Sequence, residues 1–188
     1  MLFFSYNFLM KPDTEKTNLI LIGMPGCGKS TCGVLAAKAL CKRFVDTDLL
    51  IQDKEGLSLQ EILNAKGAAY FSEAESHVLQ ELSAQNSIIS TGGSAVYYED
   101  AMKHLKERGT VIYLRISLEE MLSRIRNITT RGILLKPGET VQEMYNARVP
   151  LYEKYADRVI DCDDLTAEQA VAAICEAWYL DSNSLSAE

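Results

Sequence analysis

The sequence predicts an α/β fold, in which a parallel sheet of about five strands carries helices on both faces. Three observations support this fold class. Short runs of apolar and β-branched residues recur along the chain, helical stretches separate them, and a glycine-rich loop directly follows the first run. Continuous apolar runs of this length are typical of strands buried on both faces. Because crossover helices separate them, these strands are expected to pair in parallel.

The expected strands follow one another in a regular order. They are the runs NLILIG (18–23), RFVD (43–46), SIIST (87–91), TVIYLR (110–115) and RVID (158–161). The clearest helix follows the last run, because its apolar residues recur at helical spacing and share one face: Ala167, Ala170, Val171, Ile174, Cys175 and Trp178. The run YYEDAMKHLKER is a further amphipathic helix with mixed charge, to which the sequence assigns no functional role.

The length of 188 residues fits one well-packed domain and is short for two. We expect this domain at residues 18–180, followed by a frayed tail at 181–188. Residues 1–17 are an expected N-terminal extension. Its apolar start, MLFFSYNFLM, lacks the basic leading region and the small-residue cleavage site of a signal peptide. We therefore reject a signal peptide and keep Met10 as an alternative start.

Composition excludes several classes of partner. The net charge of -7 argues against a nucleic-acid backbone, which is bound through clustered Lys and Arg. No apolar segment is long enough for a membrane span, so no membrane partner is expected. The five cysteines form no CxxC pair, which excludes a zinc site or disulfide framework and indicates free thiols in a reducing compartment. We expect a cytoplasmic monomer that acts on a small molecule.

The stretch GMPGCGKST (23–31) matches the phosphate-binding P-loop pattern G-x-x-x-x-G-K-[ST] at the junction of a strand and a helix. Glycines allow successive backbone amides to face an anion, a lysine reaches the terminal phosphates, and a serine hydroxyl binds Mg²⁺. The sequence therefore predicts that the chain binds ATP and Mg²⁺. The candidate nucleotide-binding residues of this loop are Gly26, Cys27, Gly28, Lys29, Ser30 and Thr31.

A second candidate site follows the second expected strand. In FVDTD, Asp46 and Asp48 lie at the carboxyl edge of the sheet, where open α/β folds bind ligands. Carboxylates beside a magnesium nucleotide can support the metal and accept a proton from an attacking hydroxyl. The alternative is that one of them only caps the helix that begins near Leu49.

Arginines are concentrated in one segment of this acidic chain. Arg124 and Arg126 lie in the expected helix SLEEMLSRIR, and Arg131 lies in the polar, weakly periodic segment that follows. Residues 127–138 have the character of a mobile lid, whose closure would bring positive charge to a transferring phosphoryl group and exclude water. For Arg126 we prefer a simpler role as a solvated residue at a helix end.

Taken together, the motifs resemble those of the shikimate kinase family. The resemblance runs from about Asn18 to Trp178 and rests on GMPGCGKST, FVDTD, GLSLQEI, TGGSAV, TTRGILL and RVPLYEKYAD, in the family's order. It implies a three-layer P-loop kinase fold with a five-stranded parallel sheet, a substrate-binding region at about residues 47–82, and a mobile lid. It also implies transfer of phosphate from ATP to shikimate, giving shikimate 3-phosphate for aromatic amino acid biosynthesis.

The resemblance implies a role for each matching residue. Lys29, Asp48 and Arg131 would be catalytic, with Asp48 gripping the acceptor hydroxyls and a candidate base. Ser30 and Asp46 would lie near Mg²⁺. The remaining residues would contact ligands: Arg124 the adenine, Arg131 the phosphates, Gly92 and Gly93 the acceptor, and Arg148 its carboxylate.

The acceptor side departs from the family pattern Gly-Glu-x-x-Phe-Arg-x-x-Glu. Here the stretch is GAAYFSEAE, with Ala68 for the glutamate and Ser72 for the arginine that shares the shikimate carboxylate. The third glycine of the family is Ser94, and the lid proline after Arg131 is Gly132. Loss of one charge-assisted bond to a carboxylate costs roughly 1.5 to 3 kcal/mol, at least tenfold in affinity.

These departures leave the acceptor open. Ser72 and Glu75 are neighbours on a helix whose apolar residues Phe71, Ala74, Val78 and Leu82 are expected to face inward. Without an arginine beside it, Glu75 could receive a substrate ammonium, and homoserine has the matching layout. Another cation such as Lys66 could instead reach into the pocket.

Three functional interpretations therefore remain from the sequence. The first is phosphorylation of shikimate. The second is phosphorylation of another small hydroxy acid or hydroxy amino acid, with Ser72 and Glu75 among the substrate-binding residues. The third is an ATP-binding regulatory protein without kinase activity, against which the retained charged residues argue.

Overall fold

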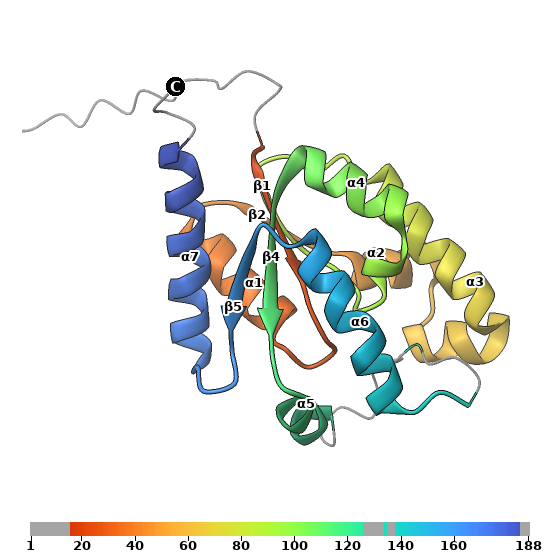
Figure 1. Ribbon diagram of the computed structural model, residues 1–188. Helices are drawn as coiled ribbons and strands as arrows, with labels where there is room; N and C mark the ends of the chain where they lie inside the picture. Colours follow the sequence, from red (N-terminus) through yellow and green to blue (C-terminus); the bar gives the residue numbers. More distant parts are fainter. Residues whose placement is uncertain (1–15, 126–133, 135–137, 185–188) are drawn as a thin grey trace, which may run out of the picture.

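The protein is built on one five-stranded sheet in which every strand pair is parallel (Figure 1). The computed structural model describes residues 16–125, 134 and 138–184. The strand order is β2-β3-β1-β4-β5. The strands are β1 (Asn18–Ile22), β2 (Arg43–Asp46), β3 (Ser87–Ser90), β4 (Gly109–Arg115) and β5 (Arg158–Asp161). The predicted strands are thus confirmed to within one residue at each end.

Helices cover both faces of this sheet, as predicted. In chain order they are α1 (Lys29–Ala39), α2 (Thr47–Glu55), α3 (Leu59–Glu81), α4 (Glu99–Arg108), α5 (Leu118–Ile125), α6 (Val141–Tyr155) and α7 (Ala167–Ser184), with a 3-10 turn η1 (Ala95–Tyr97) before α4. Helices α1 and α7 pack side by side on one face, and α4 and α6 lie on the other (Figure 1). The α/β fold class is confirmed.

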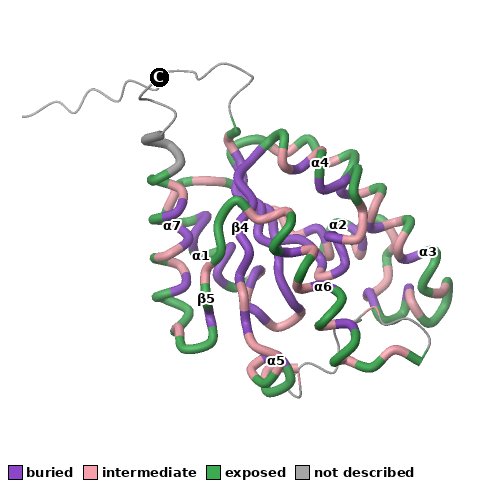
Figure 2. The backbone as a smooth tube through the Cα atoms, viewed as in Figure 1, coloured by how far each residue is buried: buried purple, intermediate pink, exposed green. Residues whose placement is uncertain are grey.

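The main core lies around the two central strands. All five residues of β1 are buried, as are the first six of β4, whereas the edge strand β5 has no fully buried residue (Figure 2). Burial on both faces explains why the central runs are continuously apolar rather than alternating. On α7, the buried residues Ala170, Ile174 and Ala177 recur at helical spacing.

A second, smaller core joins α2 to α3 at one end of the molecule. Its buried residues are Ile51, Leu59, Ile62 and Phe71. Helix α3 is broken at Gly67, whose φ of 83° is a left-handed conformation that favours glycine. Beyond this break, the second part of α3 carries Ser72 and Glu75 and leads to the start of β3.

Some expectations concern residues beyond those described. Residues 1–15 and the predicted lid at 127–138, apart from Leu134 and Gly138, lie outside the described residues, and so do Arg126 and Arg131. Helix α7 continues to Ser184, past the predicted domain end at residue 180. Among the helices in the described part of the chain, none has the length and apolar character needed to cross a bilayer.

Candidate active site

The glycine-rich loop lies at the carboxyl edge of the sheet, between β1 and α1. Gly28 is the N-cap of α1 and has a φ of 97°, so its amide begins the helix from a left-handed turn. A helix that starts in this way presents unpaired backbone N–H groups and the positive end of its dipole to an anion. The loop therefore has the geometry of a phosphate site.

Lys29 brings a positive charge into this loop. Its side chain is buried, and Nζ donates hydrogen bonds to the carbonyl oxygens of Gly23 (2.8 Å) and Met24 (2.9 Å). The Sγ atom of Cys27 lies 3.6 Å from the same nitrogen. An ammonium has three donors and rotates freely on a flexible stem. Lys29 can therefore exchange its hydrogen bonds to the loop carbonyls for hydrogen bonds to phosphate oxygens.

Oxygen groups suited to a magnesium ion lie next to the loop. The Ser30 hydroxyl is 3.3 Å from the Ser90 hydroxyl, and Ser90 pairs with Asp46 in the parallel register of β2 and β3. Mg²⁺ prefers oxygen ligands and binds through few side chains when phosphates and waters complete its shell. Within the described ranges, no group of three His, Cys, Asp or Glu residues could hold a metal. Ser30 and Asp46 therefore fit a nucleotide-bound ion.

The two aspartates of FVDTD have separate positions. Asp46 is the N-cap of α2, and its Oδ1 accepts a hydrogen bond of 3.0 Å from the backbone N–H of Asp48. Asp46 therefore caps α2, as the alternative interpretation held. The cap uses Oδ1, and Oδ2 is not part of it. Asp48, in the first turn of α2, extends toward the third strand, where its Oδ1 faces Gly92.

Arg124 bridges the phosphate loop and the residue that follows β5, both at the carboxyl edge of the sheet. From α5, its guanidinium donates to the carbonyl oxygens of Gly26 (3.3 Å) and Cys162 (3.2 Å) and pairs with Glu120 at 2.7 Å. Thr31, by contrast, is exposed in the first turn of α1. Arg124 thus lies beside the phosphate loop.

The turn after β3 is held between the loop and α2. The N–H of Gly92 donates to Thr47 Oγ1 at 3.2 Å, and the Tyr152 hydroxyl donates to the carbonyl of Gly93 at 2.6 Å. A Cβ at Gly93 would lie 3.1 Å from Pro25 of the loop. Glycine is favoured at residue 93 because the turn after β3, which we call the acceptor turn, approaches the phosphate loop closely.

Three charged side chains converge on this turn. A Cβ on Gly92 would collide with Glu75 Oε1 and lie 2.9 Å from Asp48 Oδ1, and a Cβ on Gly93 would lie 3.1 Å from Arg148 Nη1. Glu75 and Arg148 are both buried. Arg148 donates from Nη2 to the carbonyl of Leu134 at 2.8 Å and lies over the Tyr97 ring. The turn after β3 therefore brings two carboxyl groups and one guanidinium together.

Burial dominates the titration of Glu75. Desolvation raises the pKa of this carboxyl from 4.5 to about 7, and the nearby Asp48 acts in the same direction. Hydrogen bonds from Ser94 and Tyr98 and the charge of Arg148 act in the opposite direction. Because the pKa is raised, Glu75 gains and loses its proton near neutral pH.

Glu75→Gln is expected to abolish a pH dependence of stability. Between pH 4.5 and about 7 the folded state keeps a proton on Glu75 that the unfolded state has lost. The free energy of unfolding of the wild type therefore falls as pH rises through this window, by about 3 kcal/mol. Urea unfolding on both sides of the window measures this change. The matched control is Glu73→Gln, at an exposed position on the same helix.

Equal pH dependence in the wild type and Glu75→Gln would contradict the assignment. In that case Glu75 would have the same pKa in the folded and unfolded states, and its burial would have no energetic consequence.

Several features of the pocket were not predicted from the sequence. The buried line of α3 is Phe71, Glu75 and Leu79, so Glu75 itself faces inward, whereas Ala74 and Val78 are only partly buried. Tyr98 at the start of α4, assigned no role, donates a hydrogen bond of 2.9 Å to Glu75. The YYEDAMKHLKER segment, to which the sequence assigned no functional role, thus contributes a contact to Glu75.

Lys66 does not reach the pocket. It pairs with Glu55 at 2.5 Å and contacts Tyr70 on the exposed side of α3. The suggestion that this lysine replaces the missing arginine at Ser72 is therefore wrong, because its charge is already held by Glu55 on the far side of the Gly67 break.

Comparisons with known proteins agree with this arrangement. A family model described as shikimate kinase matches residues 25–178. A shikimate kinase from Clostridium botulinum (strain 657) is 41% identical over 142 residues, covering 73% of this chain and 83% of that protein.

Solved structures of shikimate kinases share the fold. The enzyme from Acinetobacter baumannii in complex with shikimate has a TM-score of 0.81 and 29% identity, covering 89% of this chain and 96% of that chain. The enzyme from Aquifex aeolicus has a TM-score of 0.75 and 34% identity, covering 89% and 98%. The sequence matches and the site geometry lead to the same conclusion: the chain belongs to the shikimate kinase family.

Proposed function

We propose that the protein transfers the γ-phosphoryl group of ATP to a hydroxyl of shikimate, giving shikimate 3-phosphate and ADP. One observation carries this proposal. The phosphate loop and the acceptor turn meet at Gly93, where Pro25 and Arg148 both approach within 3.1 Å of the position that a Cβ would occupy. A phosphate donor in the loop and an acceptor beside Asp48 and Arg148 would therefore lie next to each other.

The proposed reaction is direct in-line transfer. The acceptor oxygen forms a bond to the γ-phosphorus while the bond from that phosphorus to the bridging oxygen of ADP breaks. The acceptor proton passes to Asp48, which lies at the acceptor turn. Lys29, and Arg131 of the lid segment, stabilise the charge that develops on the phosphoryl group.

Magnesium, when bound, neutralises phosphate charge and orients the terminal phosphates. In this chain, Ser30 and Asp46 are the residues proposed to hold it, next to Ser90. Arg124 is proposed to lie against the adenine, since it already spans Gly26 and Cys162 at the nucleotide end of the sheet.

The remaining interpretations have less support. All relatives and structures named above are shikimate kinases, which favours shikimate over homoserine as the acceptor. The burial of both Glu75 and Arg148 also favours an active acceptor site over a regulatory protein, because buried ionisable groups are costly and are concentrated at functional sites.

An ADP-release assay with ATP and Mg²⁺ tests the proposal against a panel of shikimate, homoserine and gluconate. We expect ADP release that depends on shikimate and is not stimulated by homoserine. Release stimulated only by homoserine or gluconate would assign a different acceptor. Slow ATP hydrolysis that no hydroxyl compound accelerates would support the regulatory interpretation and contradict the proposal.

Replacing Arg148 by alanine is expected to raise the KM for shikimate by about tenfold to a hundredfold, because a charged hydrogen bond to a carboxylate contributes roughly 1.5 to 3 kcal/mol. The KM for ATP is expected to change little. Steady-state kinetics with each substrate varied in turn measure both values.

Because Arg148 is buried, its variants need structural controls. Arg148→Lys keeps the charge but loses the planar pair of donors, and is expected to fall between wild type and alanine. Lys154→Ala removes an exposed cation from the same helix, α6, and controls for net charge. A rise in the KM for ATP equal to that for shikimate would contradict the role assigned to Arg148.

A further inference from the structure

Glu75 is held by hydroxyl groups rather than by a cation. Its Oε2 accepts hydrogen bonds from the Ser94 hydroxyl at 2.5 Å and from the Tyr98 hydroxyl at 2.9 Å. The carboxyl is fully buried, so these bonds replace the water that an exposed carboxylate would have. Two donors on one oxygen fix the plane of the carboxyl group and therefore the direction of its other oxygen.

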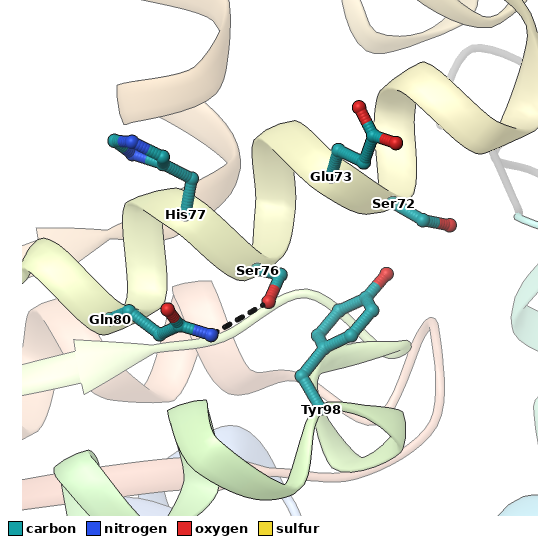
Figure 3. A pocket seen from close by; sticks show the side chains of 6 residues that line it. All are labelled: Ser72, Glu73, Ser76, His77, Gln80 and Tyr98. Carbon is teal, nitrogen blue, oxygen red and sulfur yellow. Dashed lines mark hydrogen bonds between the residues drawn. The ribbon is translucent and has the colours of Figure 1, made fainter.

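Ser72 extends this network on its outer side. Figure 3 shows the Ser72 side chain near the hydroxyl end of Tyr98. Burial and the Glu75 charge raise the pKa of Tyr98, whereas a hydrogen bond from Ser72 lowers it. The contacts therefore run from Ser72 through Tyr98 to Glu75.

The path from residue 72 to Glu75 is occupied by the tyrosine. Residues 72 and 75 are three apart on α3, so a long cation at residue 72 would reach the Glu75 carboxyl directly. Here the Tyr98 hydroxyl makes that contact instead. An open hollow of about 390 Å³ lies beside Ser72 and Tyr98, lined also by Glu73, Ser76, His77 and Gln80 (Figure 3). A longer side chain at residue 72 would therefore have room.

Glu75 and Arg148 each have one polar atom that makes no hydrogen bond to any residue that the structure describes. Within the described part of the chain, Glu75 Oε1 and Arg148 Nε are buried atoms with no hydrogen-bond partner. Glu75 Oε1 is the atom that a Cβ at Gly92 would strike. Buried polar atoms without partners are costly, and a ligand that donates to one and accepts from the other removes that cost.

From this geometry we infer that Ser94 and Tyr98 are positioning residues: they hold Glu75 so that its free oxygen, Oε1, is directed at a hydroxyl of the acceptor. They take the place of a cation at residue 72 as the partners of this carboxyl group. Ser94 has this role because its side chain, at a position where the family pattern has glycine, supplies the shorter of the two bonds. The inference rests on the proposed acceptor site.

The network also sets the charge of the pocket. Asp48 from α2, Glu75 from α3 and Arg148 from α6 face one another there, and Ser94 and Tyr98 add donors without adding charge. A cation at residue 72 would leave the pocket more positive by one charge and would strengthen its preference for a carboxylate acceptor.

Kinetics of Ser94→Ala test the inference. We expect the KM for shikimate to rise about tenfold, because the Glu75 carboxyl loses its shorter bond, while kcat and the affinity for ATP change much less. Ser94→Thr keeps a hydroxyl and is expected to recover most of the loss. Ser76→Ala, on the same helix as Glu75, removes a hydroxyl that accepts a hydrogen bond from Gln80 and serves as the matched control.

A double-mutant cycle separates positioning from packing. If Ser94 acts through Glu75, then Ser94→Ala in a Glu75→Gln background is expected to change the KM for shikimate by less than about threefold further. Tyr98→Phe is expected to behave in the same way. Full additivity of Ser94→Ala and Glu75→Gln in an active enzyme would overturn the inference and leave the proposed function intact.

A variant with a restored cation provides a second test of the inference. Ser72→Arg combined with Tyr98→Phe restores a long cation and removes the hydroxyl in its path. We expect this pair to lower the KM for shikimate and to increase discrimination against the shikimate carboxamide, in which the carboxylate charge is absent. Unchanged discrimination would overturn the inference. Absence of shikimate turnover in the wild type would instead contradict the proposed function itself.

Discussion

Replacing Lys29 by alanine is expected to reduce kcat by about a hundredfold to a thousandfold and to weaken ATP binding as well. The loss follows from the position of the ammonium, which donates to Gly23 and Met24 inside the loop that precedes α1. A preorganised positive charge beside the transferring phosphoryl group is worth this much in comparable sites. In the proposed reaction Lys29 also contacts the phosphates of bound ATP, so we expect both kcat and the ATP affinity to depend on it.

Steady-state kinetics and calorimetric titration with an ATP analogue that cannot be hydrolysed measure the two effects separately. Lys38→Ala, in the last turn of the same helix, is the matched control because it removes an exposed lysine far from the loop. Near-normal turnover by Lys29→Ala would show that the loop does not hold the transferring phosphate.

Asp48→Ala is expected to lower kcat by about a hundredfold to ten thousandfold while leaving ATP affinity close to that of the wild type. Asp48 Oδ1 faces Gly92 in the turn after β3, whereas Asp46 caps α2. Replacing Asp48 therefore removes the proposed general base and one hydrogen bond to the substrate hydroxyl, and leaves the phosphate loop unchanged.

The same two measurements decide between roles for Asp48. Asp53→Ala removes an exposed carboxylate from the same helix and controls for net charge and helix stability. If Asp48→Ala lost as much ATP affinity as Lys29→Ala, Asp48 would belong to the metal and nucleotide site, and the assignment of a general base would be wrong.

The fold was predictable because its signals are local. Central strands such as Leu19–Leu21 and Val111–Leu114 read as continuous apolar runs because both faces of the sheet are covered. The phosphate loop is equally local, since its glycines, lysine and serine act within nine consecutive residues, 23–31. Neither required knowledge of which distant segments meet.

The acceptor pocket was only partly predictable because its contacts join distant segments. Glu75, Ser94 and Tyr98 come from α3, the turn after β3 and the start of α4, and no local pattern pairs them. The sequence did reveal Ser72 and Ser94 as departures from the family pattern. The bond from Ser94 to Glu75, and the burial of Glu75 under Tyr98, depend on how α3 packs beyond the Gly67 break.

In the proposed reaction, the phosphoryl group passes from ATP to a hydroxyl of shikimate. Phosphorus NMR of the protein with ATP, Mg²⁺ and shikimate tests it most directly, because the product is identified rather than inferred from ADP. We expect a phosphomonoester signal coupled to the ring proton at carbon 3 of shikimate, growing in step with ADP. Growth of the inorganic phosphate signal alone, with shikimate unchanged, would contradict the account.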